Sequence, residues 1–311
     1  MALKNQTLVT EFILQDFSEN PHLEFLIFFL FLFFYTLTLI GNSLIIASIW
    51  VTSGLHTPMY FFLINLALLD IICTTTVVPK LLENLLKEKK VISFVGCMTQ
   101  IYIFSWALGS ELLLFTAMAY DRYVAICRPL HYNTLMNNKI CGLLVAAVWI
   151  MGGLNSSIHT AMLLQLSFCG PNVINHFFCE IPPILPLSCS STKVNELMTL
   201  VTDLLLGGAN FFLTIMSYGF IIINILKIRS EEGKKRAFST CSSHLMVVTI
   251  YYFAAFFAYI SPSISYSPEK VKAVAVMYST LSPAINPLIY TLRNKDVKSA
   301  LSKLFVRLFS F

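Results

Sequence analysis

Several ionisable side chains lie inside long apolar stretches of this sequence. Asp70 and Glu111 stand deep in two of these stretches, and the adjacent Asp121 and Arg122 end the one that begins near Cys97. Ionisable residues at membrane depth usually face a protein interior and mark a working site. Asp121 and Arg122 can pair locally, either as a structural salt bridge that closes a helix bundle or as a latch that releases Arg122 towards a partner.

The composition indicates an integral membrane protein. Of the 311 residues, 57% are hydrophobic and 12% are charged, whereas a soluble domain carries about 25% charged residues. The net charge of +5 is spread along the chain, so nucleic acid is not expected as a partner. The first apolar run opens near Leu23 behind a polar segment, which predicts a spanning helix and not a cleaved signal peptide. No Ser, Cys or His stands in a nucleophile motif, so an enzyme is not indicated.

Seven apolar runs are long enough to cross a bilayer, which takes roughly 20 helical residues. They lie at about residues 24–50, 58–82, 97–126, 140–165, 196–227, 238–260 and 271–292. The predicted fold class is therefore an all-α membrane protein, a seven-transmembrane helix bundle that forms one domain over residues 1–311. The one long connection, residues 166–195, joins the fourth run to the fifth.

The distribution of Lys and Arg predicts an extracellular N-terminus, because cytoplasmic loops carry the excess of positive charge. Asn5 begins a glycosylation sequon, which is used only on the lumenal side of a membrane. Residues 1–23 are then extracellular, and residues 293–311 form a cytoplasmic tail. Apolar residues at helical spacing in that tail predict a short amphipathic helix on the inner leaflet, in contact with membrane lipid.

Four of the eight cysteines fall on the predicted extracellular side: Cys97, Cys169, Cys179 and Cys189. Four cysteines allow three pairings. Any bridge from Cys97 would hold the long loop over the top of the bundle. In the segment His176–Glu180, His176, Cys179 and Glu180 are spaced like metal ligands. A disulfide at Cys179 would leave no thiol there to bind a metal.

Five segments of the chain carry a family resemblance. They are Leu55–Leu63, Met118–Cys127, Ser217–Tyr218, Arg236–His244 and Pro283–Tyr290. In this order they resemble the olfactory receptors of the tetrapod-type class, a branch of the rhodopsin-like (class A) G-protein-coupled receptors. The resemblance covers essentially the whole chain. It implies a plasma-membrane receptor that binds a small volatile, mostly apolar odorant in the outer half of the bundle. It also implies activation of a stimulatory, olfactory-type heterotrimeric G protein that raises cyclic AMP.

The same resemblance implies two disulfides, Cys97–Cys179 and Cys169–Cys189. The main rival from another class of protein is a membrane channel or transporter. Seven runs without an internal repeat, and a basic inner face, argue against that rival.

The third run presents one stripe of notable residues on a helical wheel of 100° per residue. With Arg122 as the origin, Phe104 returns to the same angle, Glu111 lies about 20° away and Leu108 about 40° away. The resemblance places Glu111 beside Asp70 near mid-membrane. Two alternatives stay open there: the two carboxyls bind Na⁺, or they share one proton. Apart from this possible Na⁺, no cofactor is expected.

The ligand pocket is expected in the outer half of the bundle, on the extracellular side. An apolar cavity with a few hydroxyl groups there would suit a small molecule. Phe104 occupies the place where amine receptors of the wider superfamily carry Asp, so an amine anchor is missing. Asp203 is either a solvated carboxylate within reach of Lys193 or a counter-charge for a polar or cationic odorant. The candidate lining residues are Phe104, Ser105, Leu108, Gly109, Thr202, Asp203, Leu206, Gly207, Tyr252, Ala255, Phe256, Tyr259 and Ser279.

A second group of residues is expected at the inner face. By the family resemblance, this group would link ligand binding to G-protein activation, with Arg122 released from Asp121 on activation. It comprises Asp121, Arg122, Tyr123, Tyr218, His244 and Tyr290.

Overall fold

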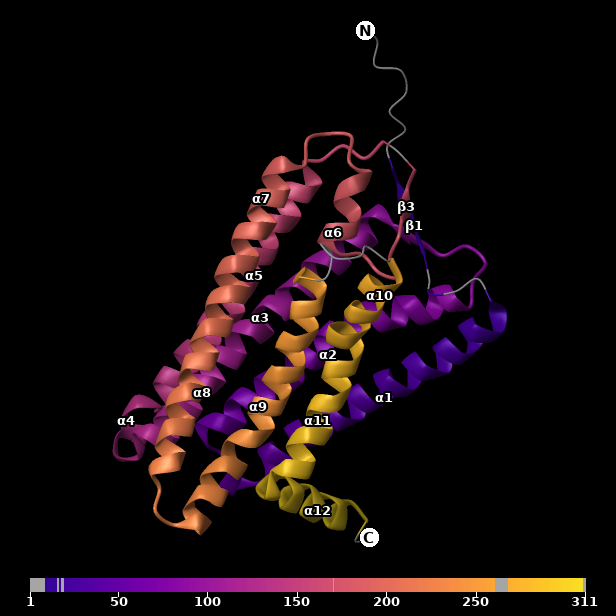
Figure 1. Ribbon diagram of the computed structural model, residues 1–311. Helices are drawn as coiled ribbons and strands as arrows, with labels where there is room; N and C mark the ends of the chain where they lie inside the picture. The colour runs from indigo at the N-terminus through magenta and orange to yellow at the C-terminus, as the bar shows by residue number, and fades with distance from the viewer. Residues whose placement is uncertain (1–8, 16, 18–19, 170, 261–267, 310–311) are drawn as a thin grey trace.

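The computed structural model describes residues 9–15, 17, 20–169, 171–260 and 268–309. Within the helices, the side chains at positions 236, 240, 255–260, 268, 293, 295 and 305–309 lie outside the description. The molecule is an elongated bundle of long helices with a small cap at one end (Figure 1).

Five helical segments are long and apolar enough to cross a membrane, which confirms the first five expected spans. They are α1 (Pro21–Val51), α2 (Pro58–Leu85), α3 (Phe94–Cys127), α5 (Asn138–Leu164) and the continuous segment Lys193–Lys227. That last segment consists of α7 (Lys193–Thr202), the π-helical turn η4 (Asp203–Gly208) and α8 (Ala209–Lys227).

Two further helical segments lie where the sixth and seventh spans are expected. They are α9 (Glu231–Ile260) and the series α10 (Pro268–Val276), η6 (Met277–Leu281) and α11 (Ser282–Arg293). The start of α9 differs from the expected residue 238, because the charged segment before it is helical as well. Ser230 Oγ accepts a hydrogen bond from the Gly233 amide at 3.1 Å, and Lys234 pairs with Glu231 at 2.8 Å. Such capping and short-range pairing extend a helix beyond its apolar part.

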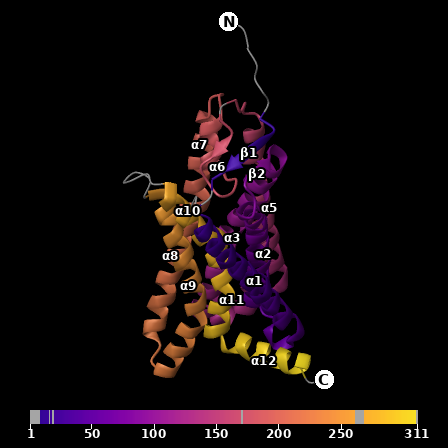
Figure 2. The same ribbon diagram turned by 90° about the vertical axis from the view of Figure 1, so that its right-hand side faces the viewer.

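Helix α3 is the centre of the bundle. It packs against α2, α5, α8 and α9, and it crosses between them in both views (Figures 1 and 2). Its first turn is capped by Ser93, whose Oγ accepts from the Gly96 amide at 3.1 Å. The approach to α5 is close, since a Cβ on Gly152 would lie 2.2 Å from Ser110 Oγ. The central position of α3 lets one helix contact both ends of the interior.

The cap contains a three-stranded sheet, which the all-α expectation missed. Its strands are β1 (Glu11–Leu14), β2 (Val91–Ser93) and β3 (Val173–Ile174), in the order β2-β1-β3. The N-terminal strand is the central one, antiparallel to β2 and parallel to β3. Burial alternates along it, with Phe12 and Leu14 inside. A strand of four residues, paired with segments far away in the chain, gives little local signal.

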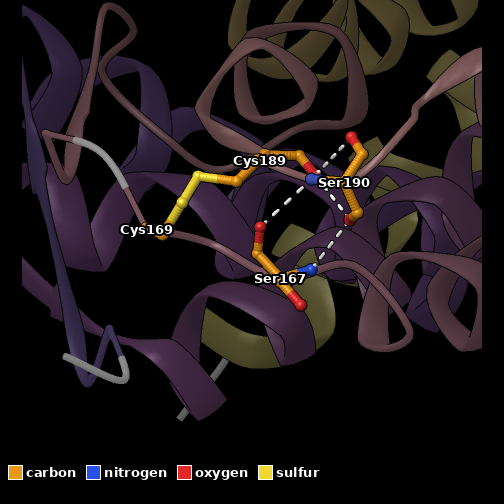
Figure 3. Close-up of a disulfide and its surroundings, with 5 residues drawn as sticks. Ser167, Cys169, Cys189 and Ser190 are labelled. Carbon is orange, nitrogen blue, oxygen red and sulfur yellow. Dashed lines mark hydrogen bonds between the residues drawn. A yellow bond between two sulfur atoms is a disulfide. The ribbon is translucent and has the colours of Figure 1, made fainter. Parts of the chain in front are cut away.

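The long loop between α5 and α7 completes the cap and is held by both disulfides, Cys97–Cys179 and Cys169–Cys189. Beside the second bridge, the Cys189 amide donates to the Ser167 carbonyl at 2.8 Å, and the Ser167 amide donates to Ser190 Oγ at 3.0 Å (Figure 3). The loop also forms the short helix α6 (Ile181–Ile184). Covalent and backbone bonds therefore fold this loop back on itself.

The C-terminal helix α12 (Lys295–Phe309) runs across the opposite end of the bundle (Figure 2). Its start is capped by Asn294, whose Oδ1 accepts from the Asp296 amide at 3.0 Å. The amphipathic helix expected here is present, but Val297, Ala300 and Leu301 are buried against the protein. Contacts with α1 and α11 account for that burial. The apolar face of α12 in this stretch therefore packs on the bundle and not on lipid.

Candidate ligand-binding and signalling site

The expected stripe on α3 faces the interior along most of the helix. Phe104, Glu111 and Arg122 of this stripe are buried, with exposed fractions of 2%, 2% and 6%, and the neighbouring Asp121 is 0% exposed. Leu108 is half-buried. The helical wheel therefore identified the inward face of α3 from the sequence.

The outer end of this stripe lies directly under the cap. The Phe104 ring contacts the Phe178 ring edge-on at 5.0 Å between centroids and the Tyr278 ring at 6.0 Å. Phe178 precedes Cys179, which is bonded to Cys97 at the start of α3. The disulfide thus holds the Phe178 ring in contact with Phe104 on the side of the cap. Ser105 is half-buried next to it.

Gly109 has a different environment from its neighbours in the expected pocket. It is buried, and a Cβ at this position would lie 3.9 Å from the Gly152 Cα of α5. In this structure Gly109 therefore lies at the contact of α3 with α5.

The expected pocket residues of the fifth span lie on α7 and η4. Thr202 Oγ1 is 3.1 Å from His159 Nε2 and donates to Asn155 Oδ1 at 3.5 Å. Leu206 and Gly207 are half-buried in the π-helical turn. His159 is 5% exposed and was not among the expected site residues. Its signal was available, because Asn155 and His159 are polar residues four positions apart in an apolar span.

Asp203 is half-buried at the start of η4. Among the ion pairs of the described residues, none joins Asp203 to Lys193. The π-helical geometry at this point is typical of functional sites.

Helices α9 and η6 supply the remaining expected pocket residues. The Tyr252 ring contacts Phe211 of α8 edge-on at 4.9 Å. Ser279 is buried, and its carbonyl accepts from Thr74 Oγ1 of α2 at 3.4 Å. Three expected lining residues have side chains outside the description: Ala255, Phe256 and Tyr259. Asn5, the expected glycosylation site, also lies outside the described residues.

The middle of the bundle contains Asp70 and Glu111. Asn286 Nδ2 donates to both Asp70 oxygens, at 3.0 and 3.1 Å. Asn42 donates instead to the Thr38 and Pro283 carbonyls. Glu111 Oε1 is buried without a hydrogen-bond partner. An orphaned buried carboxyl oxygen fits either a proton or a small cation, although no cluster of three or more His, Cys, Asp or Glu occurs in the described part of the chain.

At the end of the bundle away from the cap, called the inner end below, Asp121 holds Arg122 in a buried ion pair. Its Oδ2 accepts from Arg122 Nε at 2.8 Å and also from Nη2. Its Oδ1 accepts from the Tyr132 hydroxyl at 2.8 Å. Tyr132 begins the short helix α4 (Tyr132–Leu135) and was not foreseen, because nothing in its spacing relates it to Asp121. A cavity of about 10 Å³ adjoins Arg122 and is also lined by Met59, Met118 and His244.

Two of the other inner residues form a second contact. The Tyr218 hydroxyl lies 2.6 Å from His244 Nδ1, and the two rings are stacked at 5.8 Å. Tyr290 is fully buried, with no hydrogen-bond partner described for its hydroxyl. Tyr123 faces elsewhere, since its ring packs against Phe220 of α8 at 6.0 Å. The structure therefore gathers Arg122 and His244 around one small cavity and leaves Tyr123 on the α3–α8 contact.

A polar cluster in the cap was also missed. The Tyr278 hydroxyl donates to Glu180 Oε2 at 2.8 Å, and Glu180 Oε1 lies 3.3 Å from His176 Nε2. Burial raises the pKa of Glu180 to about 7. Burial, with a smaller effect of Lys272, lowers the pKa of His176 to about 3. Cys179 is in a disulfide, so its thiol is not available to bind a metal.

Buried charges inside a bundle of apolar helices define a multi-pass membrane protein with an internal polar path. The comparisons with known proteins give its family. The model of the olfactory receptor family matches residues 31–308. Human olfactory receptor 13A1 is 57% identical over 303 residues, which cover 97% of this chain and 92% of that protein. Human olfactory receptor 13G1 is 50% identical over 301 residues, which cover 97% of this chain and 98% of that protein. This chain belongs to the olfactory receptor family.

Membership decides the broad class of function. The relatives are receptors and not enzymes, and as a family they bind odorants and couple to G proteins. A mouse member, olfactory receptor 5AP2, is 48% identical over 301 residues, covering 97% of this chain and 95% of that protein. The match to the family model begins within α1 and ends within α12.

Proposed function

We propose that this chain is an odorant receptor of seven spans, with α9 as the sixth and α10–η6–α11 as the seventh. In this reading residues 1–311 form one receptor domain in the plasma membrane, with the N-terminus outside and residues 293–311 inside. The cap, with its two disulfides, then faces the oxidising side. The uncapped end, with Lys234 and Lys298, faces the cytoplasm.

The proposed ligand is a small volatile, mostly apolar molecule that binds between Phe104 and the cap. The observation that carries this proposal is the buried position of Phe104 under Phe178 and Tyr278. A ring in this place offers dispersion and burial but no charge, so apolar ligands are favoured over amines. In this proposal Thr202 and Ser279 supply hydroxyls to the pocket. Asp203, which is half-buried, supplies a counter-charge for polar or cationic odorants.

For signalling, we assign the inner group to coupling with a stimulatory heterotrimeric G protein that raises cyclic AMP. Asp121, Arg122 and Tyr132 form the closed latch, and Tyr218 with His244 forms a second contact between α8 and α9. Movement of α9 away from α3 would open the small cavity beside Arg122. The mid-membrane carboxyls, Asp70 and Glu111, would hold Na⁺ or share a proton while this happens.

A panel of odorants with a cyclic-AMP readout tests the proposal. Phe104→Ala should raise the half-maximal concentration for the best odorant by about tenfold or more, because a buried ring contact is lost. Phe34→Ala, a half-buried ring on α1, is the control and should leave the response near wild type. Equal loss in both variants, at matched surface levels, would contradict a pocket at Phe104. If no odorant raises cyclic AMP and the cells instead show a whole-cell current, the alternative that the protein is a channel would be supported.

A further inference from the structure

A groove of about 640 Å³ lies between α2 and α3 in the half of the bundle near the cap. It is separate from the candidate odorant pocket, since Phe104 does not line it. Its walls carry isoleucines and small hydroxyl residues, among them Ile71, Ile103, Thr75 and Thr99. Thr75 and Thr99 are exposed, so the groove opens on the outer surface of the two spans.

The groove has the length of one membrane leaflet. Along α2 its lining runs from Ile71 to Lys80, which are nine positions apart and so about 14 Å apart along the helix. Along α3 it runs from Gly96 to Ile103. The hydrocarbon core of a bilayer is about 30 Å thick, so one leaflet accounts for about 15 Å.

The two ends of the groove differ in charge. Its deep part is apolar, whereas Lys80 lines the end nearest the cap. Glu83 pairs with both Lys80 and Lys87. One carboxylate therefore faces two ammonium groups, which leaves an excess positive charge at this end.

We propose that this groove binds an acyl chain of a glycerophospholipid from the leaflet on the cap side, with the lipid phosphate at Lys80. An apolar channel one leaflet long with a cation at its polar end matches the length and charge order of such a lipid. The described lining contains no aromatic ring, unlike the candidate odorant pocket, and a flexible chain fits irregular walls of Ile and Thr.

The back of the groove also touches the cap. Gln100 lines it, donates to the Thr76 carbonyl at 2.8 Å, and accepts from the Cys179 amide at 2.8 Å. A bound chain would therefore pack against the amide that holds the loop with Phe178 in place.

Native mass spectrometry of the full-length receptor in detergent tests the proposal by titration with palmitoyl-oleoyl phosphatidylcholine. Thr99→Trp fills the groove and should weaken the tightest lipid adduct by about tenfold or more. Its control is Thr36→Trp, an exposed threonine on α1 outside the groove, which should bind as wild type. Lys80→Gln should weaken the phospholipid by about fivefold, with no effect on dioleoylglycerol, which lacks a phosphate.

Lys87→Gln is the matched control for charge, because Lys87 shares Glu83 but does not line the groove. Lipid adducts unchanged in Thr99→Trp would overturn the proposal, as would equal effects of Lys80→Gln and Lys87→Gln. If Thr99→Trp fails to fold, Thr75→Trp fills the same groove from α2 and takes its place. If the Trp variant keeps its lipid adducts but loses the odorant response, the groove binds an odorant and the lipid proposal is overturned. If it keeps its lipid adducts but no longer forms dimers, the groove binds a second copy of the chain and the proposal is overturned as well.

Discussion

The two ends of this receptor are held together in different ways. The cap end is joined by two disulfides, a three-stranded sheet and a cluster of phenylalanine rings. The inner end has no disulfide among its described residues and depends on a few polar contacts, chiefly Asp121 with Arg122 and Tyr218 with His244. Covalent bonds and backbone pairing resist opening, whereas single polar contacts can exchange partners. We therefore expect the end that faces the proposed ligand pocket to be rigid and the end with the proposed latch to be able to switch.

Removing the bridge between α3 and the loop should have the largest effect on the cap. Cys97→Ser should lower stability by about 2–5 kcal/mol and remove most receptor from the cell surface, because the Phe178 ring is no longer held in contact with Phe104. Surface labelling and thermal unfolding of purified protein measure this. Cys127→Ser alters a free, half-buried thiol and should change little. A Cys97→Ser receptor that reaches the surface and responds normally would show that the cap is not the rigid end.

At the inner end, Arg122→Ala should abolish the cyclic-AMP response while surface delivery remains partly intact. Among the described residues, the substitution leaves the buried Asp121 with Tyr132 as its hydrogen-bond partner, and it removes the group that the latch would release. A cyclic-AMP assay normalised to surface level is the measurement. Arg128→Ala, an exposed residue just after α3, is the control. A normal response from Arg122→Ala would exclude the latch.

The N-terminal strand offers a sharper test of the cap. Phe12 is fully buried in the central strand, so Phe12→Ala should cost about 3–5 kcal/mol of stability. Ile13→Ala, on the same strand but 38% exposed, should cost much less. Thermal unfolding compares the two. Equal and small shifts in the melting temperatures of the two variants would mean that the strand contributes little to the stability of the cap.

The smallest expected effect is a dependence of cap stability on pH. Burial raises the pKa of Glu180 from 4.5 to about 7, so folding favours its protonated form. That stabilisation is present below about pH 4.5 and is lost as the pH rises through about 7. His176, with a pKa lowered to about 3, acts in the opposite sense, and its contribution is lost as the pH falls below about 6.5.

Glu180→Gln removes the first of these contributions and keeps the hydrogen bond acceptor for Tyr278. Between pH 5 and 7.5, the melting temperature of the wild type should fall relative to this variant by several degrees. Glu88→Gln, an exposed residue in the loop after α2, serves as the control. Parallel curves for wild type and Glu180→Gln would show that Glu180 does not change its protonation on folding.

Several features could be predicted from residues alone because their signal is local. Helical periodicity placed Phe104, Glu111 and Arg122 on one face of α3, and all three are buried. Apolar run length located the first five spans to within a few residues. The adjacency of Asp121 and Arg122 in the chain was enough to predict their ion pair.

Other features came only from the tertiary structure, because they join segments far apart in the chain. The N-terminal strand finds its partners at residues 91–93 and 173–174, and neither pairing has a local pattern. Tyr132 reaches Asp121, and Tyr278 reaches Glu180, through packing that no spacing reveals. The apolar and charged residues of the sequence determine which helices form and which faces turn inward. Which polar group meets which depends on how those helices cross, and the tertiary structure alone decides that.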